Sequence, residues 1–305
     1  MNANKIKDFL RLKINKESTT DLLEELYKIS ETQADYNFLF QSLMGKSSDE
    51  HDYRSLKLLF MASLKIAKEQ YAYDQILEYS RNDPDNISIL SILSILETID
   101  SVKANSNYFD LKRDIHIFDI PITKGNLSPE NIIKYIEDSS QENYEPENQS
   151  VSKGSVFFLR KRINKSLDEF VNQILKYFKK AQLNIAKESP YKALSSTLSK
   201  LAFWAVKLKS GGNMEPHFHP KGLLSGVIYL DVENKSGNFI IGSSPSATTF
   251  NKNEKVIQVK TMRLIIFPSY YFHKTKFNLA SKNRFSMSFD PVSYTHLRAH
   301  ETADN

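Results

Sequence analysis

The sequence predicts an α+β protein, with a helical region over residues 1–108 and a double-stranded β-helix, a jelly-roll-like barrel with supporting helices, over residues 109–292. Two observations predict this class. In the first third of the chain, apolar residues recur at spacings of three and four, the period of a buried helix face. From Ala202 onward, short apolar runs alternate with turn residues and need no helix between them, which favours a sandwich or barrel over a parallel sheet.

The helical region is expected to contain four or five helices between Thr20 and about Ile99. The break Asp83-Pro84-Asp85-Asn86 interrupts the apolar pattern and can cap the following helix. Such a break resembles the boundary of tetratricopeptide-like repeats, and a plain helical bundle is the alternative. We expect this region to pack or to bind a partner, because it contains no catalytic cluster. The apolar stripes are Leu22, Leu23, Leu26, Tyr27 and Ile29; Leu56, Leu59, Phe60, Leu64 and Ala67; and Ile76, Leu77, Leu90, Leu93 and Leu96.

The middle of the chain has a mixed pattern. Alternation of apolar and charged residues over Asp114–Pro121 predicts a strand that ends at the proline. Ser128-Pro129 is expected to begin a short helix, with serine as the N-cap and proline in the first turn. Residues 139–154 are polar and predict a loop, whereas Leu167–Phe178 predicts an amphipathic helix that packs against the sheet.

The strand candidates that follow are separated by turn signals at Ser210–Asn213, Glu233–Gly237 and Ser243–Ser246. Together with the strand before Pro121, they are numerous enough for a double-stranded β-helix. The expected strands are Phe203–Leu208, Leu224–Val232, Gly237–Ile241, Val256–Val259, Arg263–Phe267 and Arg284–Phe289.

The composition is that of an ordinary globular protein, with 40% hydrophobic and 25% charged residues among 305. The chain contains no cysteine, which excludes disulfides, thiolate metal sites and a cysteine nucleophile. Its first residues are polar and charged, and its apolar stretches are too short to span a bilayer. We therefore expect a cytoplasmic protein.

The net charge of +5 is unevenly distributed along the chain. Residues 1–108 carry 13 Lys and Arg against 17 Asp and Glu, whereas residues 109–292 carry 27 against 17. A basic second half is compatible with an anionic substrate, a dianionic cosubstrate or nucleic acid, and equally with a solvated lysine-rich surface. No nucleic-acid-binding motif supports a nucleic-acid partner.

Three histidines form a candidate metal site. His217 and His219 are two residues apart on an extended segment, so their side chains point to the same face. His273 follows a predicted strand and can meet them at one mouth of an antiparallel barrel. Three neutral imidazoles would bind a mid-series transition metal such as iron and leave other positions open for substrate and dioxygen.

Arg284 is a candidate ligand for an anion. It lies in a predicted strand, and Ser286, two residues on, would share its face. A buried arginine needs an anion, because an unpaired buried charge is very costly. A dicarboxylate cosubstrate that reaches the metal at one end and Arg284 at the other fits the order of these residues.

These residues resemble a bacterial group within the 2-oxoglutarate/Fe(II)-dependent oxygenases, which reads H-x-H-P, S-G-x-x-Y-L, F-P-S, H and R-x-S. The resemblance covers residues 109–292, is strongest from Trp204 on, and agrees with tetratricopeptide-like helices in front. It implies that His217 and His273 are iron ligands and that Arg284 and Ser286 bind the distal carboxylate of 2-oxoglutarate. It also implies oxidative decarboxylation of 2-oxoglutarate coupled to hydroxylation. The matching segments are His217–Pro220, Ser225–Leu230, Phe267–Ser269, His273 and Arg284–Ser286.

One position departs from the wider superfamily, which has a carboxylate where this chain has His219. Either His219 is the third metal ligand, or it lies outside the first shell; Glu215 is a candidate substitute carboxylate. Two other functions stay open. One is a cupin-like protein that binds a metal or small molecule, and the other is an inactive barrel on a partner-binding helical scaffold.

The substrate cannot be read from the sequence. A protein side chain, a peptide and a small metabolite all stay open, and the helical region favours a protein or peptide partner. Residues 293–305 are expected to be a non-native tail, because they resemble a translated sequencing-adapter scar. His296 and His300 are therefore left out of the metal site.

Overall fold

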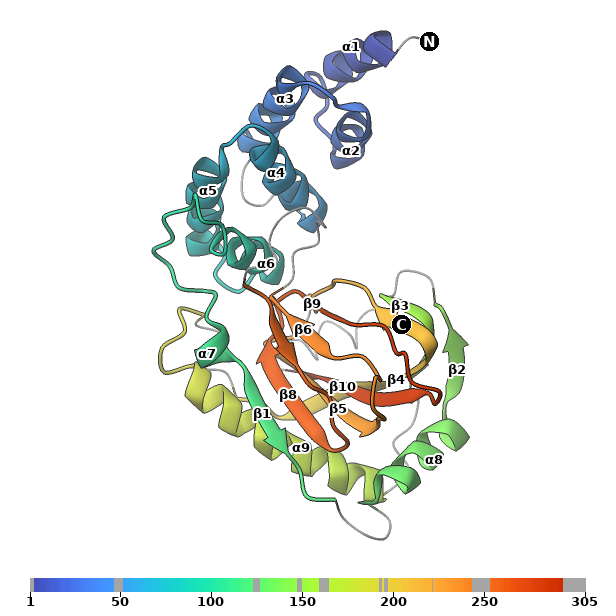
Figure 1. Cartoon of the computed structure of the whole chain (residues 1–305). Helices are drawn as coiled ribbons and strands as arrows, with labels where there is room; N and C mark the ends of the chain where they lie inside the picture. The colour runs from blue at the N-terminus through green and yellow to red at the C-terminus, as the bar shows by residue number, and fades with distance from the viewer. Residues whose placement is uncertain are drawn as a thin grey trace, which may run out of the picture. The chain divides into compact units, whose positions relative to one another are not determined.

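The computed structural model describes residues 3–46, 52–122, 127–146, 150–158, 165–191, 194, 197–220, 222–242 and 253–292. The chain divides into two compact units, Met1–Phe109 and Asp110–Asn305 (Figure 1). The expected non-native tail, residues 293–305, lies outside the described residues.

The first unit contains six helices in its described residues, and five of them lie between Thr20 and Ile99, which confirms the number expected there. The helix missed is the first, because its buried face includes Lys7, whose Nζ lies 3.1 Å from a carboxylate oxygen of Asp35. Because a charged residue occupies one position of this buried face, the sequence of the helix lacks a continuous apolar stripe. The tetratricopeptide-like character stays a prediction. The helices are α1 (Ala3–Ile14), α2 (Thr20–Ile29), α3 (Gln33–Met44), α4 (Tyr53–Lys65), α5 (Glu69–Asn82) and α6 (Ile87–Leu96).

Two predicted helix starts are confirmed. The side chain of Asn86 accepts hydrogen bonds from the backbone N–H groups of Ser88 and Ile89 at 3.1 and 3.2 Å and begins α6. The hydroxyl of Ser128 accepts from the N–H of Asn131 and begins α8 (Pro129–Ser139). Each side chain satisfies backbone donors that have no partner within the helix.

The second unit has two antiparallel sheets, which confirms the predicted jelly-roll barrel. The larger sheet has seven strands in the order β1-β8-β5-β10-β4-β3-β2, and the smaller has three in the order β7-β6-β9. Neighbouring strands are antiparallel in every described pair. The strands are β1 (His116–Asp119), β2 (Gln141–Tyr144), β3 (Val151–Phe158), β4 (Lys200–Met214), β5 (Leu224–Asp231), β6 (Phe239–Ile241), β7 (Lys255–Ile257), β8 (Arg263–Pro268), β9 (His273–Thr275) and β10 (Arg284–Val292).

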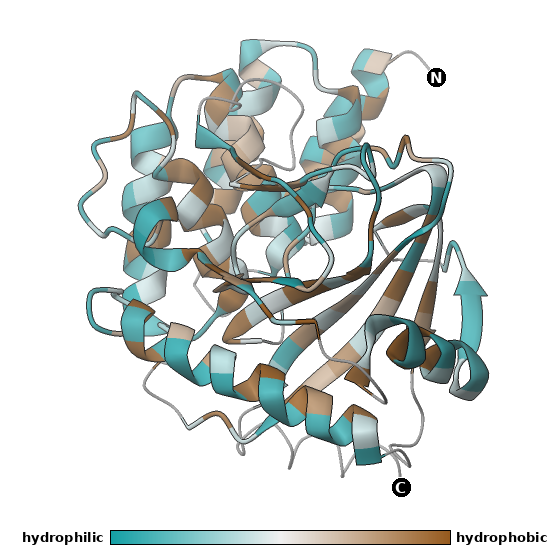
Figure 2. Cartoon of the chain, turned by 60° about the horizontal axis from the view of Figure 1, so that its bottom comes forward, coloured by the Kyte–Doolittle hydropathy of each residue, from teal (hydrophilic) through white to brown (hydrophobic). Residues whose placement is uncertain are grey.

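The long helix α9 (Lys165–Ile185) packs against the large sheet, as its apolar stripe predicts, and extends beyond the predicted Leu167–Phe178. The ring centroid of Phe178 lies 6.4 Å from that of Phe289 on β10. A Cβ added to Gly226 of β5 would lie 2.6 Å from the Phe178 ring, so this position tolerates no side chain. Figure 2 shows hydrophilic and hydrophobic residues alternating along this helix. A short helix, α7 (Leu111–Asp114), precedes β1.

The loop predicted over residues 139–154 is wrong, because this stretch contains β2 and the first part of β3. Three of the four residues of β2 are exposed. The strand lies at the edge of the sheet and is held by backbone pairing with β3, which requires no apolar side chains. Polar composition alone therefore does not distinguish an edge strand from a loop.

The turn predicted at Ser210–Asn213 is also wrong, because these residues lie within the 15-residue strand β4. The pairing with β3 passes from Leu208↔Gly154 to Asn213↔Ser152, so four residues of β4 stand opposite the single residue Lys153. Gly211 takes a φ of +77° in this bulge, a conformation that favours glycine. The glycines thus form a bulge within β4, after which the chain continues toward His217, and they do not form a turn that reverses the chain.

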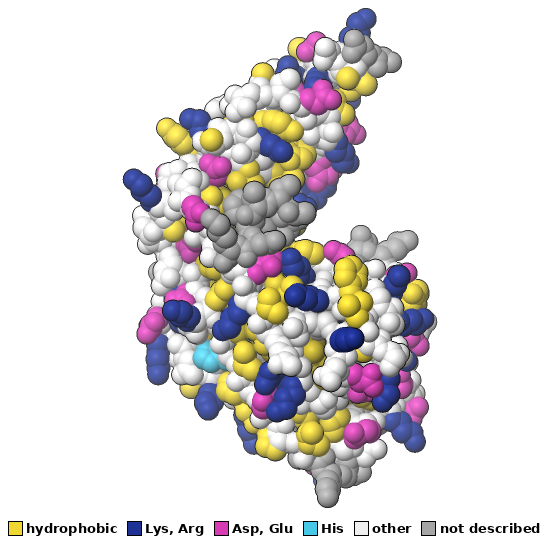
Figure 3. All heavy atoms as spheres, in the orientation of Figure 1, with side chains coloured by type: hydrophobic (Ala, Val, Ile, Leu, Met, Phe, Trp, Pro, Cys, Tyr) yellow, Lys and Arg dark blue, Asp and Glu magenta, His cyan; other side chains and the backbone are white. Residues whose placement is uncertain are grey.

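No helix in the described part of the chain is both long and apolar enough to cross a membrane. On the face drawn in Figure 3, Lys and Arg side chains are interspersed with Asp, Glu and hydrophobic side chains. The positive charge of the second half is therefore not gathered into one basic patch on that face.

Asn278 fixes the bulge of β4. It is fully buried, and its Nδ2 lies 3.1, 3.2 and 3.1 Å from the carbonyl oxygens of Leu208, Lys209 and Lys282. Its backbone N–H donates to the carbonyl of Gly212 at 2.7 Å. The amide side chain thus links the start of the bulge, at Leu208 and Lys209, to the segment before β10 at Lys282.

We expect Asn278→Ala to destabilise the barrel by about 2–4 kcal/mol, because buried carbonyl oxygens lose their donor. The measurement is urea unfolding followed by the fluorescence of Trp204, the chain's single tryptophan, which lies in β4. The matched control is Asn172→Ala on the exposed face of α9, for which we expect a change within about 0.5 kcal/mol. Equal midpoints for the two variants would contradict this role of Asn278.

Candidate metal centre and cosubstrate pocket

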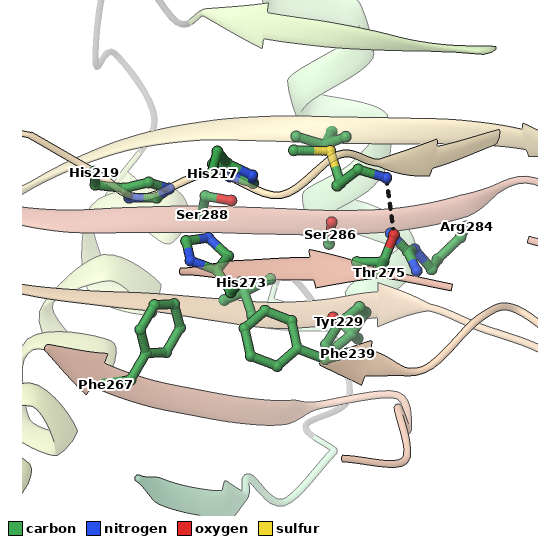
Figure 4. A pocket seen from close by; sticks show the side chains of 14 residues that line it. His217, His219, Tyr229, Phe239, Phe267, His273, Thr275, Arg284, Ser286 and Ser288 are labelled. Atoms are coloured by element: carbon green, nitrogen blue, oxygen red, sulfur yellow. Dashed lines mark hydrogen bonds between the residues drawn. The ribbon is translucent and has the colours of Figure 1, made fainter. Parts of the chain in front are cut away.

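Backbone pairing brings the three predicted histidines together. His217 and His273 form an isolated antiparallel bridge, in which each backbone N–H donates to the other's carbonyl at 3.0 and 2.9 Å. The N–H of His219 donates to the carbonyl of Ser269 at 3.0 Å. As a result, one ring nitrogen from each histidine lies within 4.8 Å of the others (Figure 4). This is the one such cluster of His, Cys, Asp and Glu in the described residues.

The tautomer of each imidazole follows from its hydrogen bond. Nδ1 of His217 lies 2.7 Å from the carbonyl oxygen of Glu215, and Nδ1 of His273 lies 3.0 Å from that of Tyr271. Nδ1 of His219 lies 2.7 Å from Oδ1 of Asp290. Carbonyl and carboxylate oxygens only accept, so each Nδ1 carries a proton, and in a neutral ring the lone pair is then on Nε2. This is the arrangement that a metal-binding histidine needs.

Burial keeps two of these imidazoles neutral. It lowers the pKa of His217 to about 3, with a smaller contribution from His219 nearby. Burial likewise lowers the pKa of His273 well below its usual value, and the two neighbouring histidines add to the effect. Both rings are therefore uncharged at neutral pH, which metal coordination requires.

The donor set fits a mid-series transition metal. Three atoms within 4.8 Å of one another fit inside a circle of radius about 2.8 Å, against metal–nitrogen bonds of about 2.0–2.2 Å. Nitrogens at this upper limit of separation would each move inward by about 0.6–0.8 Å to share one ion. The candidate carboxylate Glu215 is not in the cluster, since its Oε1 accepts from Nδ2 of Asn213 at 2.7 Å.

Arg284 lies in the same pocket and lacks an acidic partner among the described residues. It is 1% exposed, and burial lowers its pKa. Its Nη1 donates to the carbonyls of Ser236 and Gly237 at 3.2 and 3.0 Å, and its Nη2 donates to Oγ1 of Thr275 at 3.2 Å. Its Nε has no hydrogen-bond partner in the part of the chain that the structure describes. A buried guanidinium with a spare donor and no counter-charge has the character of an anion site.

The pocket between the histidines and Arg284 encloses about 400 Å³, counting the part open to solvent. Ser286, expected on the face of Arg284, lines it together with Ser288 (Figure 4). Its lining residues are Val206, Met214, His217, His219, Gly226, Val227, Tyr229, Phe239, Phe267, His273, Thr275, Arg284, Ser286 and Ser288.

Two pocket residues were missed from the sequence. Tyr229 lines the pocket, and the guanidinium of Arg284 lies 5.6 Å from its ring centroid. Thr275 holds Nη2 of Arg284. Strand alternation could have found Thr275, which is two residues after His273, whereas Tyr229 stands opposite Ser286 through the register of β5 and β10.

Comparison with known proteins identifies this part of the chain. Residues 202–290 match a protein family described as "Putative 2OG-Fe(II) oxygenase". The chain carries a 2-oxoglutarate/Fe(II) oxygenase domain. The match spans the three histidines, Arg284 and Ser286. A search of curated proteins found no match.

Several solved structures are similar to the chain at low identity. A prolyl-4-hydroxylase from Pseudomonas putida is 11% identical over 59% of this chain and 93% of its own, with a TM-score of 0.41. A prolyl hydroxylase from Trichoplax adhaerens, in complex with a hypoxia inducible factor peptide fragment, is 9% identical over 61% and 87%, with a TM-score of 0.45. HygX from Streptomyces hygroscopicus, with nickel and 2-oxoglutarate bound, is 8% identical over 59% and 84%, with a TM-score of 0.41.

Removing one histidine should abolish tight metal binding. We expect His217→Ala to weaken Co(II) binding by more than about 100-fold, beyond the loss typical of residues that only support a ligand. The measurement is anaerobic calorimetric titration. The control, His116→Ala, removes an imidazole of β1 that is not in the cluster and should leave the affinity unchanged. Equal affinities for both variants would show that the metal binds elsewhere.

The metal-free protein should lose stability as the pH falls from about 6.5 toward 4.5. Unfolded histidines take up protons near pH 6.5, whereas folded His217, with a pKa of about 3, does not. Acid therefore favours the unfolded chain in this window. The measurement is the midpoint of urea unfolding against pH, and His217→Gln should flatten the dependence. An unchanged slope in that variant would exclude His217 as a source of the effect.

Proposed function

We propose that the oxygenase domain binds Fe(II) through Nε2 of His217, His219 and His273, and binds the distal carboxylate of 2-oxoglutarate through Arg284 and Ser286. The observation that carries the proposal is a buried arginine without an acidic partner, in one pocket with three imidazoles whose lone pairs are free. When bound, iron and 2-oxoglutarate would supply the decarboxylation of 2-oxoglutarate to succinate and carbon dioxide, coupled to hydroxylation of a substrate C–H bond.

The spacing along β9 suits this assignment. Thr275 contacts Arg284 and is two residues from His273, which along a strand is about 6.6 Å. A five-carbon dicarboxylate can therefore reach toward the histidines with one end while the other lies at Arg284. The carbonyls of Ser236 and Gly237 fix the guanidinium before the cosubstrate arrives, so little ordering remains to be done on binding.

Apolar side chains surround the space between the two ends. Phe239, Phe267, Val206 and Val227 line the pocket together with Tyr229. Their rings and methyl groups exclude water, which strengthens the attraction between Arg284 and a carboxylate. The same exclusion favours the oxygenase over the cupin-like alternative, which offers no reason for a buried arginine at this place.

For the helical unit, we propose binding of a protein or peptide partner. The support is that its described residues contain no group of three or more His, Asp or Glu side chains that could hold a metal, while Phe9, Leu12 and Tyr71 expose large apolar side chains. We propose the cytoplasm as the location, because the chain contains no cysteine.

Arg284→Ala should weaken 2-oxoglutarate binding by roughly 30- to 4,000-fold, because breaking a buried charge pair costs on the order of 2–5 kcal/mol. Arg284→Lys should be a poor replacement, since lysine cannot form a bidentate pair. The measurement is calorimetry with 2-oxoglutarate in the presence of Mn(II). The control is Arg263→Ala on β8, whose guanidinium instead pairs with Asp119. Wild-type affinity in the Arg284 variants would remove Arg284 from the site and favour the cupin-like alternative.

A further inference from the structure

A carboxylate lies behind one of the three histidines. Oδ1 of Asp290 lies 2.7 Å from Nδ1 of His219, and the two side chains are 17% and 11% exposed. The hydroxyl of Ser225 donates to the same oxygen at 2.7 Å. Ser225 is also 2.9 Å from Nδ1 of His219 and 2.9 Å from the hydroxyl of Ser269. These four side chains form one continuous hydrogen-bonded group.

The fold holds this group from three adjacent strands. Asp290 lies on β10, Ser225 lies on β5, and Ser269 directly follows β8; these strands are neighbours in the large sheet. Phe289 stands opposite Gly226 in the register, which brings Asp290 beside Ser225. Asp290 is six residues after Arg284, an even spacing that puts both on the pocket face of β10.

Asp290 has no Lys or Arg partner among the described residues, and its carboxylate accepts a hydrogen bond from Nδ1–H of His219. Its negative charge is therefore available to a cation held by the histidine. The three imidazoles themselves carry no negative charge that could offset the charge of a divalent metal bound to them. A carboxylate that accepts from Nδ1–H fixes the ring and makes the opposite nitrogen a stronger ligand.

We propose that Asp290 is a positioning residue that makes His219 a metal ligand and supplies, through the imidazole, the negative charge that a coordinating carboxylate supplies in H-x-D sites. The inference rests on the proposed iron site. Ser225, itself held by Ser269, orients the carboxylate toward Nδ1. The histidine and aspartate together replace a single carboxylate ligand.

The test compares Asp290→Asn, Asp290→Ala and Ser225→Ala by anaerobic titration with Co(II). Asn can still accept from Nδ1–H but lacks the charge, so we expect about 10-fold weaker binding; Ala loses both functions, so we expect about 100-fold. Ser225→Ala should fall between Asp290→Asn and the wild type. Asp119→Asn, which removes a carboxylate at the β1–β8 edge, should bind as the wild type does.

A second readout separates positioning from general damage to the fold. In the Co(II) form, each ligand imidazole with a protonated Nδ1 gives a shifted, exchangeable proton signal by NMR. The signal from His219 should be present in the wild type, shifted in Asp290→Asn and lost to exchange in Asp290→Ala, while those of His217 and His273 persist. Loss of all three signals in Asp290→Asn would overturn the proposal in favour of a structural role.

The outcomes distinguish the two levels of inference. If His217→Ala binds Co(II) as the wild type does, the iron site itself is wrong. If His217→Ala loses the metal while Asp290→Asn and Asp290→Ala bind it with wild-type affinity, the iron site stands and only the role of Asp290 is overturned. Should Asp290→Ala fail to fold, the isosteric Asp290→Asn and Ser225→Ala decide the question.

Discussion

The reciprocal backbone hydrogen bonds between His217 and His273 are the constraint on which the site depends. They join the segment after β4 to the first residue of β9, and β9 then pairs with β6 to build the small sheet. The bridge fixes two rings with centroids 4.2 Å apart before any metal binds. Both rings point their Nδ1 atoms at backbone carbonyls, so the main chain sets ligand position and tautomer together.

The pocket separates its charges between two ends. Arg284 provides fixed positive charge at one end, whereas the other end has the neutral rings of His217 and His273 together with His219, which Asp290 contacts from behind. A dianion that bridges a metal cation and a guanidinium complements this distribution, and a neutral ligand would leave Arg284 uncompensated. The low dielectric inside the barrel makes that difference larger than it would be in water.

Strand periodicity explains which parts of this arrangement could be read from the sequence. His217 with His219, and Arg284 with Ser286, are pairs at spacing two, so one face of a strand accounts for each. Asp290 and Tyr229 obey the same alternation, but their partners lie on other strands and depend on register, which the sequence does not display. The β4 bulge could not be predicted for a further reason. Ser210–Asn213 has the composition of a turn, and the side chain that holds the bulge, Asn278, is far away in the sequence.

The contact between Gly226 and Phe178 has a mechanical consequence. Gly226 lines the pocket on one side of β5, and Phe178 of α9 presses on the other side of the same residue. At this point, a single layer of backbone separates the cosubstrate space from the helix outside the barrel. The backbone of β5 cannot move toward α9 at this point without displacing the ring of Phe178. Helix α9 therefore limits the depth of the pocket, although none of its residues lines it.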